Sequence, residues 1–271
     1  MKGNINPSEP NDSNILIYTD NDIKLFIMTE GSGPFAAEFS NFTCKVIGNL
    51  LCYDKSFFES PEHCMSDIFD RANQTIQQHI EIEECPFDDI LSGCSVTIIV
   101  RRENNLIIAH TGACKVSLIT MTEKGVVLNN VISQHHTLDY KEVERIHRAG
   151  GEVRENDGLR CYVKGREYPG CKQTRGIGCV IGKSIGILPM PSFKKYEMNP
   201  QNEDKMLLVM NRELSLLFKE QELKDICMSL GNDQFNIFND FMYKKINALI
   251  VQHQFKVNDM AYIAHMLNVN K

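Results

Sequence analysis

The residues best placed to do chemistry in this sequence lie where short apolar segments end. Glu30-Gly31-Ser32-Gly33 follows the apolar run 25–28, and a helical pattern begins a few residues later. Hard cations such as magnesium and manganese require oxygen ligands with negative charge, and Glu30 is the one carboxylate on this glycine-rich turn. The role of the turn depends on which residues accompany it elsewhere in the chain.

Composition predicts one globular domain with an apolar core. The chain has 271 residues, of which 42% are hydrophobic, and we find neither an internal repeat nor a shift in composition that would divide it. Residues 1–13 are polar and hold two prolines, which predicts a flexible leader, and residues 14–271 are predicted to form a single domain. The net charge of −6 argues against binding of nucleic acid, which requires a basic face.

Cysteine usage and hydropathy bear on the compartment. The ten cysteines include no Cys-x-x-Cys pair, and several lie within apolar runs, as expected for reduced, buried thiols. The N-terminal residues lack the apolar segment of a signal peptide, and no stretch reaches the ~18 apolar residues of a membrane span. We therefore expect an intracellular, cytoplasmic protein that is not associated with a membrane.

Hydrophobic periodicity predicts an α+β protein. Alternating or apolar runs indicate strands at 15–18, 23–28, 95–101, 106–110, 115–120, 126–129, 206–210 and 260–267. Helical spacing indicates helices at 35–50, 65–80, 138–149, 219–230 and 234–254. The segment 152–200, rich in glycine, proline and basic residues, is predicted to be an irregular loop. This order favours two face-to-face, mainly antiparallel sheets flanked by helices.

Seven segments, in this order, resemble motifs of the metal-dependent protein phosphatase 2C family, known as PPM. The family has Asp-Gly-His-Gly where this chain has Glu30-Gly31-Ser32-Gly33. The most specific match runs from Glu144-Arg145-Ile146 to Ala149-Gly150-Gly151-Glu152-Val153, preceded by Ser133-Gln134-His135-His136. The others are 92–96, 109–115, Thr174-Arg175-Gly176-Ile177-Gly178-Cys179, 207–215 and Asn258-Asp259-Met260-Ala261. The resemblance implies an α-β-β-α sandwich, in agreement with the periodicity.

The resemblance also implies a degenerate metal site. In the family, carboxylates and one glycine carbonyl hold two magnesium or manganese ions, and a metal-bound water attacks phosphoserine or phosphothreonine. The corresponding positions here are Glu30, Gly31, Ala113, Cys179, Asn211 and Asn258. Only Glu30 keeps a carboxylate, and its longer side chain displaces the oxygens. The chain is thus interpreted as a pseudophosphatase with no metal expected; any manganese or magnesium would bind weakly near Glu30.

Three functions follow from this interpretation. The first is a regulatory or scaffolding domain that binds a kinase or a phosphoprotein. The second is a weak or divergent serine/threonine phosphatase that uses Glu30 and the Gly31 carbonyl around a single metal. The third is a phosphopeptide-binding pocket formed by Arg212, His135 and His136.

Two further features are weighed against simpler interpretations. A zinc site built from Cys114, Cys179, His110 and His135 lacks metal-ligand spacing, so we favour unrelated residues there. The basic stretch 160–175 could dock an acidic partner, although a solvated loop is the default.

Overall fold

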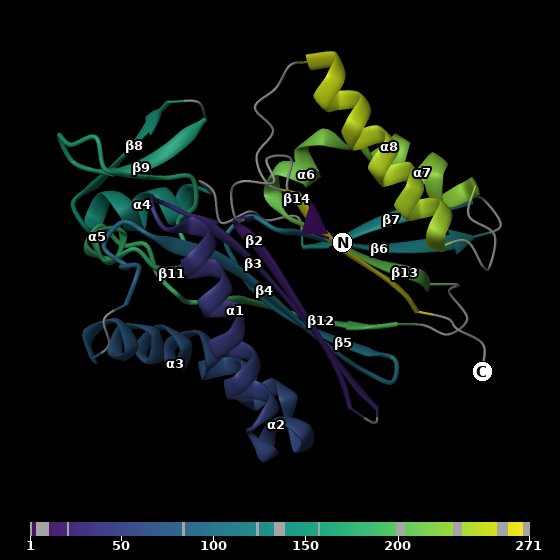
Figure 1. The fold of residues 1–271 in the computed structure, drawn as a ribbon, viewed down its shortest axis with the longest axis horizontal. Coiled ribbons are helices and arrows are strands. Elements are labelled where there is room, and N and C mark those ends of the chain that lie inside the picture. Colours follow the sequence, from purple (N-terminus) through teal and green to yellow (C-terminus); the bar gives the residue numbers. More distant parts are fainter. Residues whose placement is uncertain are drawn as a thin grey trace.

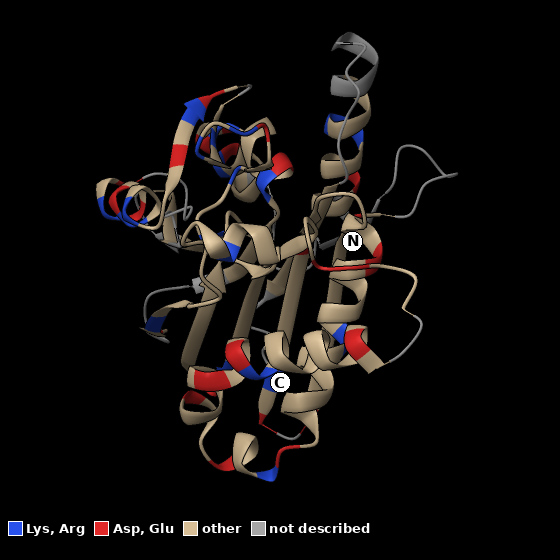
Figure 2. Cartoon of the chain, turned by 90° about the vertical axis from the view of Figure 1, so that its left-hand side faces the viewer, with Lys and Arg blue, Asp and Glu red and all other residues tan. Residues whose placement is uncertain are grey.

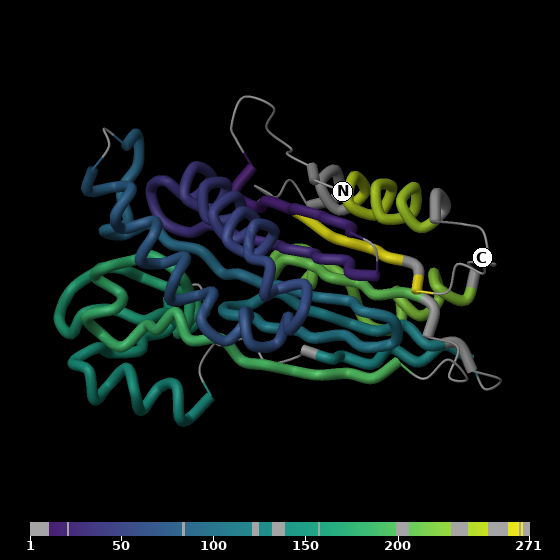
Figure 3. The backbone as a smooth tube through the Cα atoms, turned by 90° about the horizontal axis from the view of Figure 1, so that it is seen from below, coloured from purple at the N-terminus to yellow at the C-terminus, as the bar shows by residue number. Residues whose placement is uncertain are grey.

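The computed structural model describes residues 2–3, 11–20, 22–82, 85–122, 125–132, 139–156, 158–198, 204–229, 235–253 and 260–267. Within these residues two sheets, antiparallel along their main ladders, lie face to face, and helices cover their outer sides (Figure 1). The predicted α+β fold, an α-β-β-α sandwich, is confirmed. Seen from below, the strands run side by side through the middle of the molecule (Figure 3).

The first sheet carries the candidate site. Its strands follow the order β12-β5-β4-β3-β2, and β11 pairs with β4 beyond this path. Their bounds are β2 (Ser13–Asp20), β3 (Ile23–Ser32), β4 (Gly93–Arg102), β5 (Asn105–Thr111), β11 (Ile177–Gly178) and β12 (Ser192–Glu197). The predicted first hairpin is present, because β2 and β3 pair antiparallel up to Asp20 opposite Ile23.

The second sheet packs against the first. Its order is β1-β14-β13-β6-β7, with β1 (Lys2–Gly3), β6 (Lys115–Thr122), β7 (Gly125–Ile132), β13 (Asp204–Met210) and β14 (Met260–Met266). Part of the predicted leader thus belongs to a sheet, since Lys2 and Gly3 pair with β14. Residues 4–10 lie outside the described part of the chain, and the proposed boundary between leader and domain stays a prediction.

Strand alternation produces three apolar layers. On β3, Leu25 and Ile27 face a core shared with α1 (Ala36–Cys52), α2 (Lys55–Glu59) and α3 (Pro61–Ile82), whereas Phe26 and Met28 face the core between the sheets. A third core lies beneath α6 (Arg212–Leu217), α7 (Glu220–Ser229) and α8 (Phe235–His253). The central strands β3, β4 and β5 of the first sheet are buried on both faces, which explains why they are apolar with little polar alternation.

The prediction of an irregular loop at 152–200 is wrong. After α4 (Tyr140–Arg148), the chain forms a three-stranded sheet from β8 (Gly151–Glu155), β9 (Leu159–Val163) and β10 (Pro169–Cys171), then the short helix α5 (Val180–Ser184) (Figure 1). These strands have five residues or fewer and are mostly half-buried, so they leave little hydrophobic pattern in the sequence.

Surface charge is mixed across the described residues. Figure 2 shows acidic and basic residues interspersed on the helices and outer strands, while the central strands are mostly uncharged. None of the described helices is long and apolar enough to cross a membrane.

Candidate functional site

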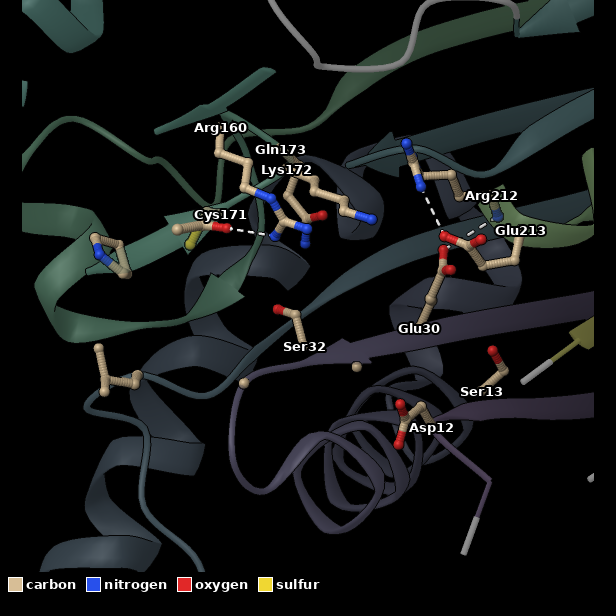
Figure 4. Close-up of a pocket in the computed structure, with 15 residues that line it drawn as sticks. Asp12, Ser13, Glu30, Ser32, Arg160, Cys171, Lys172, Gln173, Arg212 and Glu213 are labelled. Atoms are coloured by element: carbon tan, nitrogen blue, oxygen red, sulfur yellow. Dashed lines mark hydrogen bonds and ion pairs between the residues drawn. The ribbon is translucent and has the colours of Figure 1, made fainter. Parts of the chain in front are cut away.

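A cavity of about 410 Å³ opens where β3 ends, beside the start of α6 and the segment that follows β10 (Figure 4). The first sheet and α6 contribute one side, and the small sheet contributes the other. The lining residues are Asp12, Ser13, Glu30, Gly31, Ser32, Gly33, Leu91, Arg160, Pro169, Gly170, Cys171, Lys172, Gln173, Arg212 and Glu213. The turn Glu30-Gly31-Ser32-Gly33, which was identified in the sequence, therefore lines a cavity.

Glu30 and Gly31 are fixed by the backbone around them. Glu30 lies opposite Ser13 of β2 and Ser95 of β4. A Cβ atom at Gly31 would lie 2.0 Å from the backbone oxygen of Ala36, at the start of α1. Packing of α1 against the turn thus requires glycine at this position, whether or not its carbonyl binds an ion.

The carboxyl group of Glu30 is held in an environment that disfavours its charge. Burial is the main cause that raises its pKa, and the nearby acids Glu213 and Asp12 act in the same direction. Arg212 opposes the shift, because its backbone N–H donates to Glu30 Oε2 at 3.2 Å and its guanidinium is nearby. The resulting pKa is about 7.

Asn211, at the end of β13, uses both ends of its side-chain amide within the protein. It is fully buried and is the N-cap of α6, because its Oδ1 accepts the backbone N–H of Leu214 at 3.1 Å. Its Nδ2 donates to Ser13 Oγ, also at 3.1 Å. The side chain that replaces a carboxylate thus joins the second sheet to α6 and to β2.

Cationic and acidic side chains balance each other around the cavity. Arg160, Lys172 and Arg212 line it together with the acids Asp12, Glu30 and Glu213. Arg212 Nη1 forms an ion pair with Glu213 Oε1 at 2.6 Å, next to Glu30 (Figure 4). Arg160 Nη1 donates to the carbonyl of Gly170 at 3.0 Å. A site for two divalent cations needs an excess of carboxylates, which these residues do not supply.

The remaining predicted positions lie in different places. Ala113 is buried in the turn between β5 and β6 and does not line the cavity. Cys179 is buried just before α5. His135, His136 and Asn258 lie outside the described residues, so their part in the site stays a prediction.

Among the described residues, no group of three or more His, Cys, Asp or Glu side chains is arranged to hold a metal ion. The Glu30 carboxyl accepts a backbone N–H, and both the Oδ1 and the Nδ2 atoms of Asn211 form hydrogen bonds within the protein. The side chain of Ala113 has no atom that could bind a metal ion. The described residues therefore do not fit the pair of divalent cations that the matching positions hold in the phosphatase 2C family.

Sequence reasoning did not single out Glu142, the first-turn acid of α4. Its carboxylate accepts hydrogen bonds from Arg145 Nη2 at 2.8 Å, Arg175 Nη2 at 2.6 Å and Thr174 Oγ1 at 2.7 Å. Burial raises the pKa of Glu142, but these hydrogen bonds outweigh it and hold the pKa at about 2. The network joins two motif segments more than twenty residues apart in the sequence, so these motifs have a structural role that does not depend on metal binding.

The sequence analysis did not identify the single residues that line the small-sheet side of the cavity. It identified only the basic stretch 160–175 that contains them, and the basic residues of this stretch have two different roles in the structure. Arg160 and Lys172 line the cavity, whereas Arg175 is mostly buried against Glu142.

Comparison with known proteins identifies the fold and the family. Residues 10–248 match the sequence profile of the family described as Protein phosphatase 2C. The solved serine-threonine phosphatase 2C from Toxoplasma gondii superposes with a TM-score of 0.71 at 13% identity, over 94% of this chain and 90% of that one. A C. elegans sex determining protein superposes with a TM-score of 0.68 at 15% identity, over 96% of this chain and 62% of that one.

Curated relatives agree with this assignment. Probable protein phosphatase 2C 35 of Arabidopsis thaliana is 23% identical over 203 residues, which are 66% of this chain and 56% of that protein. The human integrin-linked kinase-associated serine/threonine phosphatase 2C is 22% identical over 189 residues, which are 69% of this chain and 44% of that protein. The chain thus spans about half the length of these relatives. Because the family profile matches most of its length, the chain belongs to the protein phosphatase 2C family.

Proposed function

We propose that this chain is a catalytically inactive phosphatase 2C domain that acts by binding a protein, either a kinase or a phosphoprotein, at the face that holds the cavity. The observation that carries the proposal is the state of the former metal ligands. Asn211 caps α6 and binds Ser13, while the Glu30 carboxyl accepts the Arg212 N–H. Hydrogen bonds within the protein occupy the groups that an active phosphatase would direct toward metal ions.

A domain that acts by binding a protein must stay folded after its metal ligands are lost. The Glu142 network and the three apolar cores supply stability that is independent of an ion. The cavity remains open beside Arg160 and Lys172, so the surface stays available to a partner.

A phosphate-binding version of this function is supported by the cations of the cavity. Arg160, Lys172 and Arg212 line it together, and guanidinium and ammonium groups both donate to phosphate oxygens. In this version the partner is a phosphoprotein whose phosphorylated side chain enters the cavity and is not cleaved.

Two assays on the purified chain separate these functions from residual catalysis. The first measures phosphate release from a phosphothreonine peptide in millimolar manganese or magnesium, and we expect none above the blank. Turnover that is lost in Glu30→Ala would instead establish the single-metal phosphatase. The second compares binding of the phosphorylated and plain peptides to the chain and to its Lys172→Glu variant. Equal binding of the two peptides would exclude the phosphate-binding version, and protein binding would then be sought with unmodified partners.

A further inference from the structure

Two cysteines lie in contact at the wall of the cavity. The Sγ atoms of Cys171 and Cys179 are 3.7 Å apart. Cys171 ends β10 and lines the cavity, and Cys179 directly follows β11. A disulfide bond is about 2.05 Å long, so the sulfurs need to approach by only ~1.7 Å to form one.

The surroundings of Cys179 favour a reactive sulfur. The ammonium nitrogen of Lys183, one turn along α5, is buried and has no hydrogen-bond partner among the described residues. Contact with the Cys171 thiol lowers the pKa of Cys179, and the Gly182 N–H and the Lys183 charge act in the same direction, whereas burial and the Asp89 carboxylate raise it. A positive charge and a donated hydrogen bond both stabilise a thiolate.

A third cysteine lies close by but is in a different environment. Cys161 on β9 pairs with Cys171 across the small sheet. It is 1% exposed within an apolar cluster that includes Ile146 and Ile185, and burial raises its pKa to about 11. Cys161 is therefore the alternative partner of Cys171 that an experiment must distinguish.

We propose that Cys171 and Cys179 form an oxidisable dithiol that hydrogen peroxide converts into an intramolecular disulfide. The Cys179 thiolate attacks one peroxide oxygen, the O–O bond breaks, and hydroxide leaves and takes up a proton to form water. The Cys171 thiol then attacks the sulfur of the resulting Cys179 sulfenic acid, and its proton leaves with the hydroxyl group as a second water. Two thiols are oxidised and one peroxide is reduced. A small oxidant is required because Cys179 is only 5% exposed.

The disulfide would connect two parts of the structure that otherwise meet at the cavity. Cys171 belongs to the small sheet, whereas Cys179 is anchored to the first sheet by its backbone N–H, which donates to Ser92 O at 2.7 Å. Lys172 and Gln173, which follow Cys171, line the cavity across from Glu30 (Figure 4). Oxidation thus fixes the wall that carries Lys172, and it can alter the entry of a partner without any change at Glu30.

The sequence provides a direct test, because trypsin separates the three cysteines. Cleavage after lysine and arginine places Cys161 in peptide 161–164, Cys171 in 167–172 and Cys179 in 176–183. The reduced full chain is treated with hydrogen peroxide, its free thiols are blocked, and the digest is analysed by mass spectrometry. We expect peptides 167–172 and 176–183 to appear as one species that dithiothreitol separates.

Variants make the result specific. The cross-link must persist in Cys161→Ala and disappear in Cys171→Ser. A link between 161–164 and 167–172 would overturn the proposal. So would recovery of 167–172 and 176–183 as separate blocked or over-oxidised peptides from the wild-type chain, and that outcome needs no variant to fold.

Discussion

Replacement of Glu30 by glutamine tests whether this carboxyl is kept neutral by its surroundings. The pKa of Glu30 is about 7 in the folded protein and 4.5 for an unperturbed side chain. Between these values the folded protein holds a proton that the unfolded chain releases. The free energy of unfolding contributed by Glu30 therefore falls as pH rises from about 4.5 to 7, and then stays constant. A glutamine has no such dependence.

The pKa values set the size of the effect. Each pKa unit between the folded and unfolded states corresponds to 1.36 kcal/mol, so a folded pKa of about 7 means that ionised Glu30 destabilises the protein by at most about 3 kcal/mol. Glu30 is partly exposed to the cavity, so screening by solvent reduces this value. Glutamine still accepts the Arg212 N–H through its carbonyl. We therefore expect Glu30→Gln to be more stable than the wild-type chain by about 1–3 kcal/mol at pH 8.

Urea unfolding at several pH values measures this difference. The stability gain of Glu30→Gln should shrink toward zero as pH falls below about 4.5, where the wild-type carboxyl becomes protonated in both states. Glu155→Gln removes an exposed carboxylate that does not line the cavity, and serves as the matched control. A Glu30→Gln variant that is no more stable than wild type at pH 8 would refute the reasoning.

Three further substitutions probe the same structure by chemical denaturation. Glu142→Gln should lower the free energy of unfolding by about 3 kcal/mol at pH 7, because the ionised carboxylate, with its folded pKa of about 2, stabilises the protein above pH 4.5. This loss of stability should shrink below pH 4.5, and a loss that does not vary with pH would contradict the reasoning. Asn211→Asp should destabilise the chain by about 1–3 kcal/mol, because it puts a buried charge near Glu30 and removes the donor to Ser13, and manganese should not restore stability. Gly31→Ala should cost at least about 2 kcal/mol, because its Cβ meets the α1 backbone, and a neutral result would mean that the turn can shift.

Most of the architecture could be predicted because long buried helices and strands produce clear hydrophobic periodicity in the sequence. β3 and β13 alternate between two cores, and the hairpin turn at 19–22 has the expected polar residues. The helix α6 was missed, although Asn211 followed by an acid is a typical helix start. The small sheet was missed because its strands are short and mostly half-buried, so they show no clear periodicity.

The site could be predicted only in part. The sequence identified Glu30, Gly31, Asn211 and Arg212 through their place in motifs, and three of them, Glu30, Gly31 and Arg212, line the cavity, while Asn211 lies buried beside Arg212. It did not reveal that Asn211 binds Ser13, a contact across 198 positions of the chain. Nor did it reveal the contact between Cys171 and Cys179, because the strands beside them have only two or three residues and leave no pattern that predicts side-chain direction.

The central claim is that the former metal site no longer binds its ions. Calorimetric titration of the purified, chelator-treated chain with manganese and magnesium tests it most directly, with Glu30→Gln as the reference. We predict no saturable heat up to millimolar ion from either protein. Saturable binding by the wild-type chain that is lost in Glu30→Gln would contradict the account and establish a working metal centre at Glu30.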